Sequence, residues 1–407
     1  MRRIVYIGLP SDGHFIPSTV ISKELLNMNI EVLYLGCSSY KSRIEAIGAD
    51  YIYCEEMEKL WIENMKFSKC SLYNRKNEFS ILDIEKNYAR WIRAYKNRGT
   101  TLLDTVSRLS PDYIIYDAHA RWGRYIANKL GISSLCIQTS AAANKEMCNK
   151  NFLFFAQYFL KAEKELQKEP DVLKAKIEMI ISKLCSDNQI DDFSMVDGYG
   201  CQSDLNIIWG KKVLQPFSNY FNEEKYFFFY NKKDTGIKQR TTHSRNIIYI
   251  CLGSVLCNCY DSWKFYNTCL SVLIKIGDYK IVISAGENEN KIIKDPRVII
   301  KNKIDQKSIL KEAILCINHG GKNTIEECLE NEVPMIIYPY SNDQFVNAFM
   351  VEKNGFGLQL QDITENNLNV LVEKIMNSCS YRENIRSHNS KLDKNDVLSH
   401  CLDRFLN

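Results

Sequence analysis

Residues 313–347 constrain the fold of this chain more than any other stretch. The apolar run Ala313 to Ile317 predicts a short buried strand, and the small and hydrogen-bonding residues at 319–324 favour a tight turn followed by a helix start. A second buried strand is predicted from Val333 to Tyr338, and another helix opens after Pro339. Strands that alternate with helices in this way predict an α/β domain with a parallel sheet.

Polar residues follow both predicted strands at their carboxyl ends, which is the edge where open parallel sheets bind ligands. Gly320 and Gly321 let the backbone approach a ligand closely, and the free N–H groups of the next helical turn favour an anion such as a phosphate. Asp343 and Gln344 open the second helix. For the first six residues alone, an ordinary turn capped by Thr324 is the alternative interpretation.

The same stretch contains the pattern H-x-G-x-N-T-x-x-E, followed by V-P and then by P-x-x-x-D-Q and an asparagine. The matched positions are His319, Gly321, Asn323, Thr324, Glu327, Val333, Pro334, Pro339, Asp343, Gln344 and Asn347. This pattern resembles the donor-sugar signature of the UDP-glycosyltransferase superfamily, most of all its bacterial macrolide-glycosyltransferase branch. The resemblance implies the GT-B fold, an α/β architecture of two Rossmann-like, doubly wound domains facing a cleft.

The resemblance also implies which residues bind a nucleotide sugar. His319 and nearby amides would hold the diphosphate, Glu327 the ribose hydroxyls, and Asp343 with Gln344 the hydroxyls of the transferred sugar. The full set of implied donor-binding residues is Gly253, Ser254, Gln306, His319, Gly321, Asn323, Thr324, Glu327, Asp343 and Gln344.

Gly253 and Ser254 belong to this set because they follow another apolar strand, Ile247 to Leu252. A glycine there lets a phosphate approach, and a serine hydroxyl can donate to it. Gln306 ends a segment in which many members of the resembled family carry an aromatic residue that stacks on the nucleobase. Here Lys303 stands at that position, so the choice between UDP and dTDP donors stays open.

A strand, a helix and a second strand are predicted within the first 35 residues. Arg3 to Leu9 and Ile30 to Leu35 are strand-like, and Ser18 to Met28 carries apolar residues at helical spacing. Such a unit opens a doubly wound domain and places His14, in the first turn, at the carboxyl edge of the sheet. A lone histidine there is more often an ordinary turn residue. The G-H-x-x-P pattern around His14 nevertheless resembles the start of these glycosyltransferases, in which this histidine is the general base.

The chemistry of sugar transfer explains why such a base is needed. A hydroxyl acceptor loses its proton as it attacks the anomeric carbon, and imidazole has a pKa near the working pH. Asp117 ends the predicted strand Tyr113 to Tyr116 and would orient the ring and stabilise the imidazolium. An aspartate there also caps helices well, but its counterpart in the resembled family, in a P-D-x-x-x-x-D run before W-G, is the partner of the base. His119 is the alternative base.

Composition excludes other classes of function. With 407 residues the chain exceeds what one hydrophobic core usually serves, so two domains are expected. A net charge of +4, from 53 basic and 49 acidic residues, gives no indication of nucleic-acid binding. No apolar run reaches the length of a membrane span and the amino terminus lacks the layout of a secretory signal, so a cytoplasmic location is expected.

The cysteines and acidic residues give no metal-site pattern. Fifteen cysteines run from Cys37 to Cys401 without a C-x-x-C pair or a histidine at ligand spacing, so free, buried thiols are expected. No D-x-D pair that holds a divalent ion in other glycosyltransferases stands out. We therefore expect no metal and no cofactor, with the nucleotide sugar as co-substrate.

The predicted domain organisation follows from these elements and from the resemblance. A charged, non-periodic stretch at 231–245 is the best linker in the chain. The expected parts are an acceptor-binding domain at 1–230, a nucleotide-sugar-binding domain at 246–385 and a carboxyl-terminal helix at 386–407 that packs back on the first domain. The resemblance implies that segments 56–98 and 144–191 line the acceptor pocket, and Phe152 to Leu184 is expected to form a pair of amphipathic helices.

The predicted function is an inverting glycosyltransferase that moves a hexose, glucose first, from a UDP- or dTDP-sugar to a hydroxyl of a small-molecule acceptor such as a natural product. Two alternatives stay open. One is a nucleotide-sugar epimerase of the same fold, and the other is a catalytically inactive homologue that acts as a binding or activating protein.

Overall fold

The computed structural model forms two compact units, each with its own sheet. One unit comprises Met1–Asn64, Lys76–Asn231 and Asn395–Asn407, and the other comprises Met65–Arg75 and Lys232–Lys394. The structure describes residues 2–65, 78–200, 202–230, 245–340, 342–390 and 397–407. The predicted linker at 231–245 therefore lies outside the described residues, apart from Arg245.

The first unit is built on a seven-stranded sheet whose paired strands are all parallel, in the order β3-β2-β1-β4-β5-β6-β7. Its strands are β1 (Arg3–Ile7), β2 (Glu31–Gly36), β3 (Asp50–Tyr53), β4 (Tyr113–Asp117), β5 (Ser134–Gln138), β6 (Leu205–Trp209) and β7 (Tyr226–Phe229). Most are short runs of Ile, Val, Leu and Tyr, as expected for strands covered on both faces. The strand order reverses between β1 and β4, and in such sheets this reversal opens a ligand crevice at the carboxyl ends of the strands.

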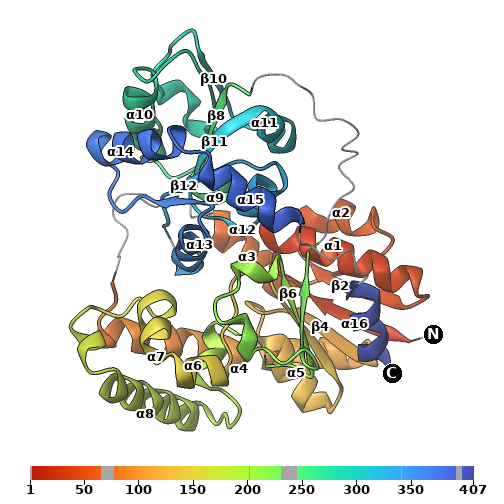
Figure 1. The fold of residues 1–407 in the computed structure, drawn as a ribbon. Helices are drawn as coiled ribbons and strands as arrows, with labels where there is room; N and C mark the ends of the chain where they lie inside the picture. The colour runs from red at the N-terminus through yellow and green to blue at the C-terminus, as the bar shows by residue number, and fades with distance from the viewer. Residues whose placement is uncertain (1, 66–77, 201, 231–244, 341, 391–396) are drawn as a thin grey trace. The chain divides into compact units, whose positions relative to one another are not determined.

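Helices cover this sheet, as the ribbon in Figure 1 shows for α1, α5 and α16. The helices are α1 (Asp12–Asn27), α2 (Lys41–Glu45), α3 (Glu55–Met65), α4 (Ile81–Arg108), α5 (Trp122–Leu130), α6 (Lys145–Lys150), α7 (Phe152–Phe154), α8 (Pro170–Asn188) and α16 (Val397–Leu406). The longest, α4, begins at a capping box in which Ser80 and Asp83 satisfy each other's backbone N–H groups. It packs against both α5 and α8.

The expected pair of amphipathic helices from Phe152 to Leu184 is wrong. The chain forms the single turn α7, a π-helical turn at Phe155–Phe159, a 3-10 turn at Leu166–Lys168 and then one long helix, α8. Pro170 starts α8 because its missing N–H costs nothing at the first helical position. The phenylalanines before it also pack on a distant part of the chain, since the ring of Phe154 lies 5.0 Å from that of Phe217.

The carboxyl-terminal helix α16 packs within the first unit. The ring of Phe405 lies 5.1 Å from that of Tyr113 on β4, and the Tyr113 hydroxyl donates to the Leu406 carbonyl at 2.9 Å. Ser399 donates to Glu24 of α1 at 2.7 Å. The preceding helix, α15 (Ser380–Ser390), contacts α12 (Lys322–Glu330) of the second unit.

The second unit has a six-stranded parallel sheet in the order β10-β9-β8-β11-β12-β13, which is the same topology on a new set of strands. The strands are β8 (Ile247–Cys251), β9 (Lys280–Ser284), β10 (Val298–Lys301), β11 (Ala313–Asn318), β12 (Met335–Ile337) and β13 (Gly357–Gln359). Its other helices are α9 (Gly253–Leu256), α10 (Ser262–Leu273), α11 (Gln306–Glu312), α13 (Asn342–Lys353) and α14 (Glu365–Met376). Here the order reverses between β8 and β11.

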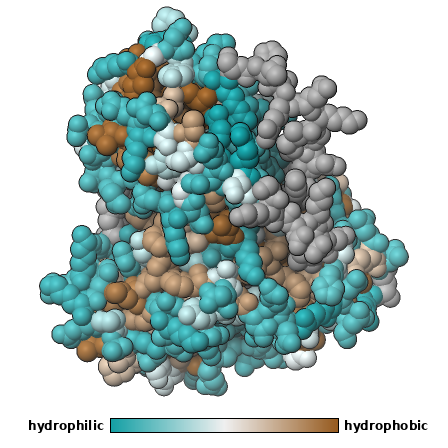
Figure 2. Space-filling model, viewed as in Figure 1, coloured by the Kyte–Doolittle hydropathy of each residue, from teal (hydrophilic) through white to brown (hydrophobic). Residues whose placement is uncertain are grey.

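The described cysteines agree with the expectation of free, buried thiols. None of the cysteines in that part of the chain forms a disulfide, and all but Cys379 are buried. No described helix is long and apolar enough to cross a membrane. On the face drawn in Figure 2, hydrophilic residues predominate and the hydrophobic ones gather in small patches.

Candidate active site

His14 is held at the carboxyl edge of the first sheet by the start of α1. It is the third residue of the helix, and the Ser11 carbonyl accepts its N–H at 3.1 Å and that of Phe15 at 2.8 Å. The loop between β1 and α1 packs closely, because a Cβ added to Gly8 would lie 2.5 Å from the Tyr34 hydroxyl oxygen. The imidazole is therefore attached to a short, fixed loop.

The structure brings His14 and Asp117 together as the sequence predicts. Asp117 ends β4, which pairs directly with β1 through Ile7 and Tyr116, so the two strands end side by side. The Nδ1 atom of His14 lies 2.7 Å from Oδ2 of Asp117. The histidine side chain is 22% exposed and the carboxylate only 2%. A buried carboxylate thus stands behind an imidazole that solvent can reach.

The electrostatics of the pair keep Asp117 ionised. Burial by itself would raise the pKa of this carboxyl, but the charge and hydrogen bond of His14 outweigh it and hold the pKa below its ordinary value. The other oxygen, Oδ1, accepts the backbone N–H of His119 at 2.8 Å. A carboxylate on Nδ1 fixes the tautomer with its proton on Nδ1, so Nε2 is the basic nitrogen of His14.

His119, the alternative base, has a different environment. Its ring packs edge-on to that of His14 with centroids 5.2 Å apart, and its side chain is exposed. Its backbone N–H, rather than its ring, contacts Asp117, and no carboxylate contacts the ring within the part of the chain that the structure describes. The orienting carboxylate therefore belongs to His14.

Thr139 also contacts the base, and the sequence interpretation missed it. It directly follows β5, the neighbour of β4, and its hydroxyl oxygen lies 3.0 Å from Nδ1 of His14. The apolar run Leu135 to Ile137 is a strand signal that could have placed Thr139 at the same sheet edge as Asp117. The ring of His14 is thus oriented by groups from two adjacent strands.

In the second unit, His319 lies at the equivalent point, where the strand order reverses. It follows β11, and two glycine backbones pack against its ring. A Cβ on Gly253 would lie 2.6 Å from its Cε1 atom, and one on Gly321 would lie 2.5 Å from Nε2. Gly253 has a φ of +70°, which favours glycine. The predicted residues Gly253, Gly321 and His319 are therefore in direct contact.

The His319 ring is neutral in this environment. Burial lowers its pKa to about 4, and no charge among the described residues offsets this effect. Its Nδ1 atom is buried and has no hydrogen-bond partner among the described residues. A buried polar atom of this kind marks a place where a ligand group can complete the hydrogen bonding.

The side chain of Gln306 contacts three other side chains, two of which are also predicted donor-binding residues. Its Nε2 atom donates to Glu327 at 2.6 Å and lies 3.5 Å from the Thr324 hydroxyl, while its Oε1 accepts from the Tyr249 hydroxyl at 3.2 Å. Thr324 and Glu327 project from the first two turns of α12. The structure thus groups Gln306, Thr324 and Glu327 at the start of α11 and α12.

Gln344 lies in the first turn of α13, next to the turn after β11. Its Oε1 atom accepts the N–H of Tyr340 at 2.7 Å, and its backbone oxygen would lie 3.2 Å from a Cβ on Gly320. Asn347 of the same helix donates to the Gly320 carbonyl at 2.9 Å. These contacts join the two loops of the predicted signature, so Asp343 and Gln344 lie on the helix packed beside the His319 turn.

Two predicted donor residues have fewer described contacts. Asn323 is partly exposed in the first turn of α12, and its side chain makes no hydrogen bond to the described residues. The backbone of Ser254 lies in α9, but its side chain is not among those that the structure describes. No cluster of potential metal ligands occurs in the described part of the chain.

The predicted site residues therefore form two groups, one in each unit. His14 and Asp117 lie where β1 meets β4, and the donor set lies around β8 and β11. Both places are topological switch points of doubly wound sheets, the usual position of ligand sites in such folds.

Comparisons with known proteins agree with this architecture. Residues 236–404 match the family model described as UDP-glucoronosyl and UDP-glucosyl transferase. An uncharacterized UDP-glucosyltransferase, YojK of Bacillus subtilis, is 27% identical over 94% of this chain and 91% of its own length. The oleandomycin glycosyltransferase of Streptomyces antibioticus is 22% identical over 88% of this chain and 79% of its own.

The solved structure of the spinosyn rhamnosyltransferase SpnG, complexed with thymidine diphosphate, superposes with a TM-score of 0.68 at 12% identity, and the match covers all of both chains. Two parallel doubly wound sheets, each with polar residues at its switch point, define this chain as a GT-B glycosyltransferase fold. Residues 236–404 thus resemble the UDP-glycosyltransferase family, and the two similar proteins named above are bacterial glycosyltransferases.

Proposed function

We propose that this protein is an inverting glycosyltransferase that moves a hexose, glucose before others, from a UDP- or dTDP-sugar to a hydroxyl of a small-molecule acceptor. The observation that carries the proposal is the contact of 2.7 Å between His14 and the buried, ionised Asp117. A histidine so oriented suits a base that takes a proton from a hydroxyl near neutral pH.

The reaction is a single displacement. As the acceptor hydroxyl oxygen attacks the anomeric carbon, its proton moves to Nε2 of His14. The bond between the anomeric carbon and the diphosphate oxygen breaks, and the nucleoside diphosphate leaves with the electron pair. Asp117 stabilises the imidazolium that forms, as the aspartate of a catalytic triad does. Attack opposite the leaving group inverts the anomeric configuration.

The donor is bound by the residues grouped in the second unit. A diphosphate oxygen would accept a hydrogen bond at the His319 turn, where amides and the N-terminus of α12 favour negative charge. Glu327, held by Gln306, would accept hydrogen bonds from the ribose hydroxyls. Asp343 and Gln344 would bind hydroxyls of the transferred sugar. These preorganised donors would stabilise the leaving group without a metal ion.

The names of the relatives support a small-molecule acceptor. One is an oleandomycin glycosyltransferase, and the spinosyn rhamnosyltransferase has been solved both with thymidine diphosphate and with the spinosyn aglycone. Either nucleotide is therefore a reasonable donor to test. Lys303 is exposed at the position where many members of the family stack an aromatic ring on the base, which favours weak discrimination between the two bases.

The test is release of UDP from UDP-glucose, and of dTDP from dTDP-glucose, with a panel of phenolic and macrolide acceptors. Wild type, His14→Ala and His400→Ala are compared, because His400 is an exposed histidine of the same unit. We expect acceptor-dependent release that is lost in His14→Ala and retained in His400→Ala. Tight nucleotide binding with no release for any pair would contradict the proposal and favour an inactive homologue.

A further inference from the structure

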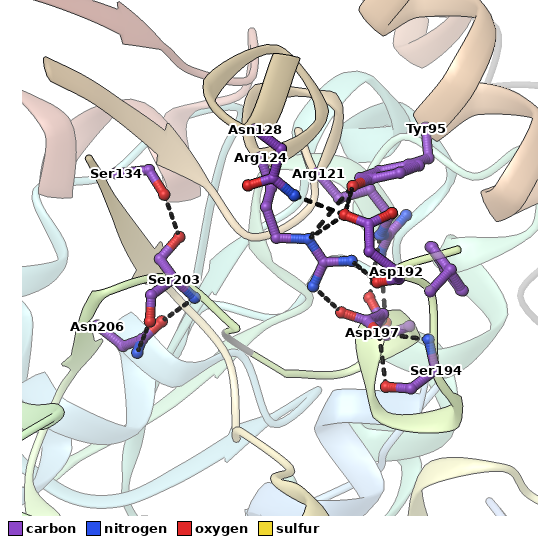
Figure 3. Close-up of polar contacts among 12 residues, drawn as sticks. Tyr95, Arg121, Arg124, Asn128, Ser134, Asp192, Ser194, Asp197, Ser203 and Asn206 are labelled. Atoms are coloured by element: carbon purple, nitrogen blue, oxygen red, sulfur yellow. Dashed lines mark hydrogen bonds and ion pairs between the residues drawn. The ribbon is translucent and has the colours of Figure 1, made fainter. Parts of the chain in front are cut away.

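Two arginines at the start of α5 have opposite electrostatic environments, and Figure 3 shows both. Arg124 is buried and paired with a carboxylate. It forms an ion pair with Asp197, its Nη2 donates to the Asp192 carbonyl at 2.6 Å, and its Nε lies 3.4 Å from the Tyr95 hydroxyl. Such pairing is what a buried charge requires.

Arg121, three residues earlier, is largely buried without a carboxylate. Its Nε and Nη2 atoms donate to the backbone carbonyls of Asp197 and Gly198, each at 3.2 Å. Among the residues that the structure describes, no carboxylate lies within ion-pair distance and no acceptor meets Nη1. Two described acids act on Arg121 through their charge, but Asp197 pairs with Arg124 and Asp117 contacts His14. Burial lowers the pKa of Arg121 to about 10, so the guanidinium stays charged at neutral pH.

The two carbonyls accept only part of the five N–H groups of Arg121, and the others need an explanation, because donors of a largely buried cation are costly to leave without an acceptor. The position of Arg121, directly after the turn that follows β4, provides an explanation. The Ala120 N–H donates to the Asp117 carbonyl at 2.7 Å, so the loop after β4 is a tight turn and Arg121 directly follows it. The unpaired cation is thus four residues from the carboxylate that orients His14.

Aromatic rings adjoin this cation. The guanidinium of Arg121 lies 5.4 Å from the centre of the Trp91 ring, and Tyr199 packs edge-on against Trp91 at 5.1 Å. Tyr199 also packs against Phe155 at 5.6 Å and Phe159 at 5.7 Å. Trp91 and Tyr199 are both partly exposed. A cation beside partly exposed rings suits a ligand that combines a flat apolar ring with a negative charge.

We propose that Arg121 binds a carboxylate of the acceptor, and that the preferred acceptors are therefore aromatic hydroxy acids. The carboxylate pairs with the free N–H groups of the guanidinium, the ring of the acceptor packs on the Trp91 and Tyr199 surface, and the acceptor hydroxyl is the group that His14 deprotonates. This inference rests on the proposed function, and it makes Arg121 a specificity-determining residue.

The test compares a matched pair of acceptors, 4-hydroxybenzoate and its uncharged amide, with wild type, Arg121→Gln and Arg121→Lys. In wild type we expect kcat/KM for the acid to exceed that for the amide by about 10- to 100-fold, the range of a charge-assisted hydrogen bond. Arg121→Gln should abolish this preference by lowering only the value for the acid, and Arg121→Lys should restore part of it. Lys129→Gln, which removes an exposed charge from the same helix, should behave as wild type.

Binding of 4-hydroxybenzoate without donor, followed by isothermal titration calorimetry, separates this inference from the proposed function. Binding that weakens in Arg121→Gln supports the inference even if no sugar is transferred. Equal kcat/KM for acid and amide in wild type overturns the inference while leaving sugar transfer intact. Weaker UDP binding in Arg121→Gln also overturns it, because Arg121 would then serve the donor. If Arg121→Gln does not fold, the acid preference of wild type and Arg121→Lys decides.

Discussion

Replacing Asp117 by Asn tests the role of the buried carboxylate behind His14. The substitution keeps the size and removes the charge that lies 2.7 Å from Nδ1. Two unit charges about 4 Å apart interact by roughly 4 kcal/mol at the effective dielectric of a protein site, and each 1.36 kcal/mol is about tenfold in rate. We therefore expect kcat/KM to fall by about a thousandfold. The amide also favours the wrong imidazole tautomer, which adds to the loss.

The assay is acceptor-dependent nucleotide release, with UDP affinity measured separately by calorimetry. Asp104→Asn, an exposed aspartate of α4, is the matched control and should keep wild-type activity. UDP affinity should be unchanged in Asp117→Asn, because the proposed donor residues lie in the other unit. Activity of Asp117→Asn within about threefold of wild type would refute the reasoning, since a charge worth several kcal/mol cannot be removed from a catalytic pair at so small a cost.

The same variant has a predicted pH signature in stability. The pKa of Asp117 is lower in the folded protein than its ordinary value, so its ionisation stabilises the fold above about pH 4. This contribution is lost as the pH falls through the depressed folded pKa. In urea unfolding, the free energy of unfolding of wild type minus that of Asp117→Asn should be largest near neutral pH and should shrink below about pH 4. A difference that stays constant down to pH 2 would contradict the assigned charge.

Three further predictions concern the switch point of the second unit and the ion pair of Arg124. Gly253→Ala places a Cβ against the His319 ring at a positive φ, so it should destabilise the protein by about 1–3 kcal/mol in thermal unfolding and weaken UDP binding in calorimetry. The control Gly13→Ala, which has open space around its Cβ, should have neither effect. The protein should take up a proton when it binds UDP between pH 5 and about 6, because the bound diphosphate raises the low pKa of His319. Calorimetry in buffers of different ionisation enthalpy measures this uptake, and binding heats that are the same in all buffers would contradict it. Arg124→Leu should cost about 3–5 kcal/mol by leaving Asp197 buried and unpaired, and adding Asp197→Leu should recover part of that loss in urea unfolding.

Much of the fold could be predicted from the sequence because buried parallel strands are continuous apolar runs. The runs at Ile247 and Ala313 became β8 and β11, and their following glycines did mark the places where backbone and ring pack closely. The contact between His14 and Asp117 was predictable for the same reason, since both residues directly follow strands that a doubly wound sheet places side by side.

The features that were missed depend on contacts between distant parts of the chain. Thr139 follows a short apolar run, Leu135 to Ile137, which is a usable strand signal but a weaker one than the longer run before His319. Arg121 has no carboxylate partner among the described residues because Asp197 pairs with Arg124 instead. Arg121 and Asp197 are 76 residues apart in the sequence, so this outcome could not be predicted from a local pattern. The irregular turns after Phe152 pack on distant residues, as the contact of Phe154 with Phe217 shows, and helical spacing does not reveal such contacts.

The most direct test of the account is the anomeric configuration of the first product. An α-linked UDP- or dTDP-hexose is supplied with an accepted hydroxyl compound, and the anomeric proton coupling of the product is read by NMR at early times. Base catalysis by His14 in a single displacement predicts the β-linked product, formed by wild type and lost in His14→Ala. An α-linked product would contradict the account, because retention requires two displacements and a nucleophile that the pair of His14 and Asp117 does not supply.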